Sequence, residues 1–213
     1  MEHSDRDAFL AAARIAADLV HRPEVEARWS DESACAGMTV GGLACHLASQ
    51  LDTTVRLLGA GVSEQAPIRL EDHYVRAAWV RSGPDDEANL GIREGSNEQA
   101  ETGTAALRSL VSRRLEELPD ALASVSSGDP VLIPWQGWSL AAHDFLVTRL
   151  METVVHSDDL AASVGLETPA FPDDVVRPVV DLLTGLALRR HGATSVVRAL
   201  SRPQRAPDSI AAF

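Results

Sequence analysis

The longest uninterrupted helical pattern of the chain covers residues 139–165, and it constrains the fold more than any other segment. Ser139 is a suitable N-cap because its hydroxyl can accept a hydrogen bond from the first turn. Gly165 stands where a left-handed residue ends a helix, and no proline interrupts the run. Glu152 and His156 are four residues apart and share one helix face, where a carboxylate and an imidazole can bind one divalent cation.

A second helix is predicted at residues 39–58, with Thr39 as its cap, and it supplies a third candidate ligand. His46 borders its apolar face, so the imidazole is directed towards a partner helix. The apolar positions have helical spacing: Val40, Leu43, Leu47, Leu51, Val55 and Leu58. We therefore predict a metal site of His46, Glu152 and His156 between two packed helices, with at least one coordination position open. Two histidines and one carboxylate suit zinc or another borderline divalent ion.

Other interpretations of these histidines stay open from the residues alone. A glutamate–histidine pair at this spacing is often only a surface contact, and His46 alone is typical of a buried histidine with a hydrogen-bond partner. His143 lies nine residues before Glu152, on the opposite helix face, and is rejected as a ligand. His73 has no assignable geometry, and a surface position is expected for it.

The residues around the three candidate ligands resemble a known family. The first segment contributes Trp29, Thr39, Val40, His46 and Leu47, and the second contributes Arg149, Glu152, Val155, His156, Asp159 and Leu160. Together they resemble the mycothiol-dependent maleylpyruvate isomerase N-terminal domain, within the DinB-like group of metal-binding four-helix bundles. The ending at residues 196–213 also looks like the C-terminal edge of that family, so the resemblance covers nearly the whole chain. It implies a bound metal and mycothiol as thiol cosubstrate.

The helical patterns along the chain predict an all-α fold, an up-and-down four-helix bundle with a short C-terminal helical extension. Residues 1–166 are assigned to the DinB-like metal-binding bundle and residues 167–213 to an extension packed on it. The remaining helices are predicted at residues 4–20, 70–80, 96–118, 171–191 and 194–200, with breaks at Ser82–Pro84 and Pro119. Residues 85–94 are ambiguous, and residues 131–138 are predicted to be extended or looped.

Four further residues are candidates for the site, each with an alternative role. Asp159 shares the stripe of Glu152 and His156, where it either orients the imidazole or lies in solvent. Arg149 either binds a substrate carboxylate or pairs with a nearby acid. Trp135 and Trp138 either line the cosubstrate pocket or belong to the core. Cys45 adjoins His46 but is rotated away from it, so it is expected to be a packing residue.

Composition excludes several classes of function. The formal net charge of −12 argues against binding to nucleic acid or an anionic membrane, and no apolar run is long enough to span a bilayer. All basic residues other than histidine are arginines, which excludes Schiff-base chemistry on a lysine and indicates a GC-rich, actinobacterial source. Cys35 and Cys45 do not form a disulfide framework, so a cytoplasmic location is expected.

These observations together predict an enzyme in which a metal activates mycothiol to attack an electrophilic small molecule. A thiol coordinated to a metal loses its proton, and the thiolate is the nucleophile. The resemblance implies a further C-terminal domain in the isomerase, whereas here a short extension follows Leu166, so S-transfer is favoured over isomerisation. Detoxification and secondary metabolism are the expected settings, with the chain as a monomer or a homodimer. The alternatives are a metal-dependent hydrolase and a metal-stabilised binding module without activity.

Overall fold

The computed structural model describes residues 3–81 and 86–213, and the described chain is mostly helical. The four long helices of the body are α1 (His3–Val20), α3 (Val40–Gly59), α7 (Thr104–Ala123) and α8 (Ala142–Val164). Shorter helices are α2 (Pro23–Ala27), α4 (Leu70–Arg76), α5 (Ala78–Arg81) and α6 (Glu87–Ala100). The C-terminal part contains α9 (Asp173–His191), α10 (Ala193–Ser201) and the 3-10 turn η1 (Pro203–Arg205). The predicted all-α, DinB-like fold class is confirmed.

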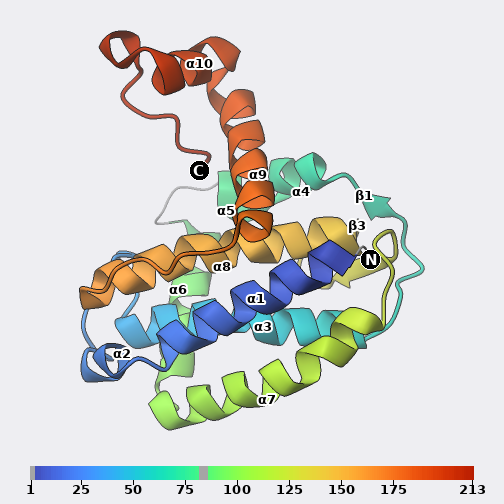
Figure 1. Ribbon diagram of the computed structural model, residues 1–213, viewed down its shortest axis with the longest axis vertical. Coiled ribbons are helices and arrows are strands. Elements are labelled where there is room, and N and C mark those ends of the chain that lie inside the picture. The colour runs from blue at the N-terminus through green and yellow to red at the C-terminus, as the bar shows by residue number, and fades with distance from the viewer. Residues whose placement is uncertain (1–2, 82–85) are drawn as a thin grey trace.

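The four long helices pack side by side, with α3 in contact with α1, α7 and α8 (Figure 1). Their order does not alternate strictly in direction, as an up-and-down bundle would require. Arg114 of α7 donates to Asp52 of α3 at 2.7 Å, and Ser124, just after α7, donates to the carbonyl of Leu58. Residue numbers thus rise together along both helices, so α3 and α7 are parallel. The parallel arrangement is possible because α3 and α7 are connected by the long segment 60–103, which contains α4, α5 and α6.

A small sheet lies where α8 begins. The prediction that this helix starts at Ser139 is wrong, because residues 138–141 form a strand and α8 begins at Ala142. Strands β2 (Pro130–Ile133) and β3 (Trp138–Ala141) form an antiparallel hairpin, and β1 (Pro67–Ile68) joins β3 in parallel. Ser139 lies in β3, where its hydroxyl hydrogen-bonds to Ser63 instead of capping a helix. The end of α8 is as predicted, since Gly165 adopts a left-handed φ of +73°.

The predictions for the other helices are confirmed in part. Thr39 caps α3 by accepting a hydrogen bond from the backbone N–H of Gly42, as expected. Pro119 does not end α7, which continues to Ala123. The helix expected at 96–118 is two helices, because Gly103 at φ +83° separates α6 from α7. The helix expected at 70–80 bends at Ala77 into α4 and α5, and the break expected at Ser82–Pro84 lies outside the described residues.

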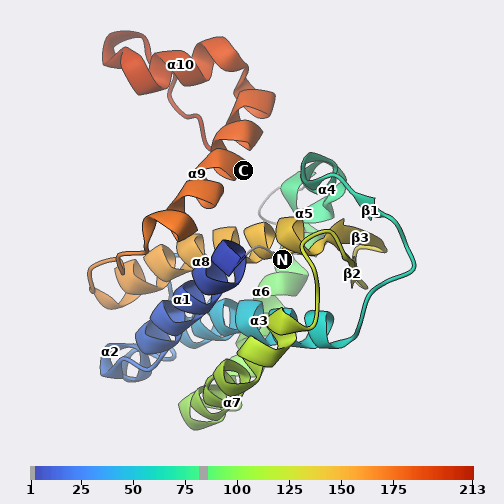
Figure 2. The same ribbon diagram turned by 45° about the vertical axis from the view of Figure 1, so that its right-hand side comes forward.

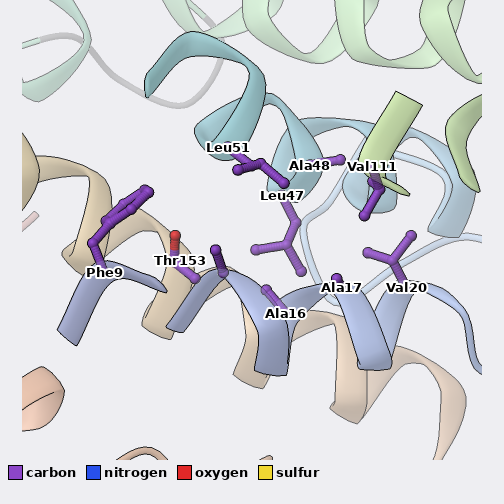
Figure 3. Close-up of a pocket in the computed structure, with 10 residues that line it drawn as sticks. Phe9, Ala16, Ala17, Val20, Leu47, Ala48, Leu51, Val111 and Thr153 are labelled. Carbon is purple, nitrogen blue, oxygen red and sulfur yellow. The ribbon is translucent and has the colours of Figure 1, made fainter. Parts of the chain in front are cut away.

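The core of the bundle is built from small and large apolar side chains in alternation. Alanines on α1 let the helix backbones approach closely, while Phe9 and Phe145 are among the largest fully buried side chains. Figure 3 shows α1 and α3 in contact through Ala16, Leu47 and their neighbours, beside Thr153 of α8. The space left among these side chains is about 10 Å³, no larger than one water molecule needs. This part of the interior therefore does not hold a ligand.

The C-terminal helices form an arm that stands off the bundle. The first turns of α9 pack on α1 and α8 through the buried residues Val175 and Val179. The rest of α9 leads away from the bundle to α10, at the far end of the molecule (Figures 1 and 2). The tail then returns, and Phe213 stacks on Tyr74 of α4. The division at residue 166 stays a prediction, although the extension does pack on the bundle at its base.

The described part of the chain contains no helix with the length and apolar character needed to cross a bilayer.

Candidate metal centre

The start of α3, which carries His46, is fixed by close contacts with the preceding loop and with α6. A Cβ atom on Gly41 would lie 2.5 Å from the ring of Trp29, so only glycine fits there. Trp29 in turn donates its indole N–H to the carbonyl of Ala100 at 3.0 Å. The side-chain oxygen of Asn97 accepts from the backbone N–H of Thr39 at 2.9 Å. These contacts fix where α3 begins and how it is rotated about its axis, and both determine the position of His46.

Three candidate donor atoms from α3 and α8 lie together. Glu152 Oε2 is 3.8 Å from His46 Nε2 and 3.1 Å from His156 Nε2. The two imidazole rings meet edge to face, with centroids 4.7 Å apart. Ligand atoms about 2.0–2.2 Å from a tetrahedral zinc ion are separated by roughly 3.3–3.6 Å, which lies between the two observed distances. The donor set therefore fits a divalent cation with small adjustments of its side chains.

The charges of this cluster support the same conclusion. Burial by itself raises the pKa of Glu152, but its contacts with His156 and His46 outweigh burial and hold the pKa well below its ordinary value. Burial lowers the pKa of His156, but its contacts with Asp159, Cys35 and Glu152 raise it well above the ordinary value. Without a metal, the site thus has the charge pattern of a carboxylate paired with an imidazolium. A divalent cation would replace the imidazolium proton, as expected for a metal ligand.

Asp159 contacts the Nδ1 atom of His156, on the side of the ring opposite Glu152. Its Oδ2 lies 3.0 Å from His156 Nδ1, so the proton on Nδ1 is donated to the carboxylate and Nε2 is left to face Glu152. Cys35 donates its thiol hydrogen to the same Oδ2 at 3.4 Å. The donor atoms of Cys35, His156 and Asp159 form a second group that could hold a metal. Sequence analysis did not place Cys35 at the site, because Cys35 lies in the loop before α3 and has no helical spacing to the other site residues.

Arg149 lies on α8 next to the candidate ligand Glu152, and its hydrogen bonds go to residues outside the cluster of candidate ligands. Its guanidinium donates to Gln50 Oε1 at 2.6 Å and to Thr148 Oγ1 at 3.1 Å. Gln50 also donates to the backbone carbonyl of His46, four residues earlier on α3. The hydrogen bond between Arg149 and Gln50 is therefore a second link between α3 and α8, about one turn from the candidate ligands. It places the positively charged guanidinium of Arg149 beside the candidate centre.

The two tryptophans of the hairpin differ in position. Trp135 is 59% exposed in the turn between β2 and β3. Trp138 is partly buried and donates its indole N–H to His73 Nδ1 at 3.1 Å. The expectation of a surface position for His73 is wrong, since the residue is buried. Burial, with a smaller contribution from Arg149, lowers the pKa of His73 to about 4. No local pattern indicates this contact, because the two residues are 65 positions apart.

His143 and Cys45 lie where the sequence predicted them. His143 Nδ1 is 3.0 Å from Asp5 Oδ2, and its side chain is 49% exposed, so it stands apart from the centre. Cys45 is buried in the core, and burial raises the pKa of its thiol to about 11. Neither residue lies where it could join His46, Glu152 and His156 in holding a cation.

The chain matches the family described as Mycothiol maleylpyruvate isomerase N-terminal domain over residues 9–161. This range includes α1 from its second turn, all of α3 and most of α8, and so all three candidate ligands. No curated protein and no solved structure matches the chain. Since the matched range is well over half of the 213 residues, the chain belongs to the mycothiol maleylpyruvate isomerase N-terminal domain family.

Proposed function

We propose that this protein is a metal-dependent enzyme that uses mycothiol as a nucleophile against an electrophilic small molecule. The observation that supports it most is the convergence of His46, Glu152 and His156 from two separate helices on one point. Membership of a mycothiol-related family supports the choice of thiol. The free cysteines Cys35 and Cys45 agree with a reducing, cytoplasmic location, which we include in the proposal.

In this proposal, His46, Glu152 and His156 hold a divalent cation, with zinc preferred. When bound, the cation supplies Lewis acidity that lowers the pKa of a thiol at its open position. Asp159 keeps the His156 ring in the orientation that directs Nε2 to the site. The carboxylate of Glu152 would offset one of the two positive charges of the cation, and the remaining positive charge would favour an anionic thiolate at the open position.

Arg149 has the role of binding an anionic group of the electrophile. Gln50 and Thr148 fix its guanidinium, so little side-chain entropy is lost when a substrate carboxylate binds. Trp135 is exposed enough to contact mycothiol from the hairpin side. Trp138 acts indirectly, because its indole N–H is already committed to His73.

The reaction that we favour is S-transfer. The thiol proton leaves to solvent, the sulfur forms a bond to an electrophilic carbon, and the leaving group departs with its bonding electrons. Addition to a cis double bond, rotation and elimination would give isomerisation at the same centre. Both reactions need the same thiolate, so the choice between them depends on the substrate.

A hydrolase is the second candidate, and the contacts of Asp159 disfavour it. Hydrolysis needs a carboxylate or imidazole near the metal that can take a proton from water. Glu152 is a candidate ligand, and Asp159 already accepts from His156 and Cys35. Neither carboxylate is placed to act as a general base without losing its present contact.

The test combines metal analysis with thiol consumption. Purified protein is assayed for bound zinc and for loss of mycothiol with epoxides, alkyl halides and activated double bonds. The His46→Ala variant should lose both metal and activity, whereas His143→Ala, a histidine outside the centre, should lose neither. Absence of metal-dependent thiol consumption with every electrophile class would count against the proposal.

A further inference from the structure

The C-terminal arm, defined as residues 173–205, has a charge distribution opposite to that of the rest of the chain. Residues 182–207 contain five of the 19 basic residues and none of the 31 acidic ones. Four of these arginines, Arg189, Arg190, Arg198 and Arg202, are exposed around the end of α9 and on α10, which we call the tip. The beginning of α9, which we call the root, carries the three exposed acids Asp173, Asp174 and Asp181 and one exposed arginine, Arg177, so its net charge is negative. The arm is therefore acidic at one end and basic at the other.

An apolar stripe connects the root and the tip. Val180 is 51% exposed and Leu188 is 39% exposed, and Thr184 lies between them at the same four-residue spacing. These residues share one face of α9, directed away from the bundle contacts of Val175 and Val179. On α10, Val197 and Leu200 are also exposed, and Leu200 reaches 73%. Several large apolar side chains within one arm are more than scattered surface residues usually provide.

The arm has a defined direction, because it is held at both ends. Its root packs on α1 and α8, and the tail after the tip returns to the body. His191 Nε2 contacts the carbonyl of Ala211 at 2.8 Å, and Phe213 stacks on Tyr74. With 19 residues, α9 is about 28 Å long, so root and tip are well separated (Figure 2).

We propose that the arm is the dimer interface of this protein, with a second copy of the chain as its partner. The α9 helices of two copies pack antiparallel across a two-fold axis, with Thr184 near the axis and Val180 of each copy against Leu188 of the other. Antiparallel packing places the basic tip of each arm beside the acidic root of the other. Both contacts form twice, as an isologous interface requires.

A cleft at the root gives the partner's tip a place to bind. It has a volume of about 390 Å³ and lies between α1, α8 and the start of α9. Its lining includes apolar residues, among them Leu146 and Leu150. The charged lining residues are three acids and one arginine: Asp5, Asp173, Asp174 and Arg177. An exposed leucine flanked by arginines, such as Leu200 between Arg198 and Arg202, complements such a cleft in both polarity and charge.

An anionic membrane is the other partner that a basic, apolar tip could bind. It would account for the arginines and for Leu200, but not for the acidic root or the stripe that runs along α9 between root and tip. A second copy accounts for all three features. We therefore use membrane binding as a competing outcome of the test.

The first measurement is the mass of the full chain in solution by sedimentation velocity or light scattering. We expect twice the 22.8 kDa of one chain at micromolar concentration, with dissociation at high salt. Leu188→Asp should raise the dimer dissociation constant by more than about 10-fold, because it buries a charge near the axis. The matched control is Val62→Asp, at an exposed apolar residue outside the arm, which should leave the mass unchanged.

Charge reversal tests the antiparallel arrangement itself. The tip variant Arg189→Glu/Arg190→Glu and the root variant Asp173→Arg/Asp174→Arg should each be monomeric, since like charges then meet in both contacts. An equal mixture of the two should recover the dimer, because every root again faces a tip of opposite charge. Circular dichroism of each variant checks that it is folded.

Three results would overturn the proposal. One is a single-chain mass at every concentration, with or without binding to phosphatidylserine vesicles. Another is a dimer that survives both charge reversals, which would place the interface elsewhere. The third is a mixture of the reversed variants that stays monomeric while both variants are folded.

Discussion

Two histidines withdrawn from solvent, His73 in α4 and His156 in α8, differ in what surrounds them. His73 receives a hydrogen bond from the neutral indole of Trp138, and burial lowers its pKa to about 4. His156 contacts the carboxylates of Glu152 and Asp159, which outweigh burial and raise its pKa well above the ordinary value. One imidazole is therefore neutral at pH 7, and the other is charged when no metal is present.

The comparison shows that burial alone does not make a histidine functional. Both residues lie at contacts between elements that are distant in the sequence, and both have a partner on Nδ1. Only His156 has acceptors on both nitrogens, and only there do further donor atoms converge. The α4–hairpin contact is thus a neutral structural contact, whereas the α3–α8 contact has the charge and donor arrangement of a binding site.

The largest expected effect is on zinc affinity and comes from removing the negative charge of Glu152, whose carboxylate contacts both His156 and His46. Glu152→Gln keeps the size of the side chain but removes the carboxylate, so zinc affinity should fall by about 1,000-fold or more. Groups beyond the ligands already contribute roughly 10–100-fold, and a direct ligand contributes more. Titration calorimetry with zinc measures the change.

The control for that measurement is His143, a histidine of α8 that pairs with Asp5 of α1. His143→Ala removes the contact to Asp5 without touching the three candidate ligands, and zinc affinity should not change. If the Glu152→Gln variant bound zinc as tightly as the unmodified protein, the α3–α8 contact would not differ from the α4–hairpin contact in metal binding.

The next effect concerns stability in acid and depends on His73. The pKa of His73 is about 4 when folded, below its ordinary value of 6.5, so the unfolded chain binds the proton more readily. The stability linked to this group is fully present above pH 6.5 and is lost as the pH falls towards 4. The total loss is about 3 kcal/mol, from the size of the shift.

The His73→Asn variant should lack this part of the pH dependence, because asparagine can accept from Trp138 but does not titrate. Its free energy of unfolding, measured in urea at several pH values, should fall less between pH 6.5 and 4 than that of the unmodified protein. Equal slopes in the His73 variant and the unmodified protein would show that His73 is not buried as a neutral group.

A smaller effect is expected from the carboxylate behind His156. Asp159→Asn still accepts from His156 Nδ1 but carries no charge, so zinc affinity should fall by about 10–100-fold. The Asp158→Asn variant changes the neighbouring acid, whose contact is with Thr168, and should have no effect. A loss as large as that of Glu152→Gln would indicate that Asp159 is itself a ligand, together with Cys35.

The residues that sequence analysis located correctly are those with a local signal. Thr39 caps α3 three residues before the N–H that it accepts from, and Glu152, His156 and Asp159 follow helical spacing on one face. The position of His46 at the edge of an apolar helix face led to the prediction that it meets them. The family resemblance supported this prediction, because no local pattern shows that α3 packs on α8.

The residues that it missed depend on contacts over long sequence distances. Cys35 contacts Asp159 across 124 positions, and His73 contacts Trp138 across 65. Ser139 appeared to be an N-cap because serine before an apolar run is typical of one, but pairing with β1 and β2 places it in a strand. Propensity at that position is outweighed by hydrogen bonds to segments that the local sequence does not indicate.

The smallest effect that we predict measures the neutral contact directly. Trp138→Phe removes the indole N–H that His73 accepts, and a hydrogen bond of this kind contributes about 1 kcal/mol to the free energy of unfolding. The smaller ring adds a packing loss, so the single variant overstates the bond. A double-mutant cycle with His73→Leu removes the packing contribution and should give a coupling of about 1 kcal/mol. Trp135→Phe, at the exposed tryptophan of the same hairpin, should change stability by less than about 0.5 kcal/mol. A coupling near zero would mean that burial alone keeps His73 neutral, and the contrast with His156 would then depend only on the carboxylates of α8.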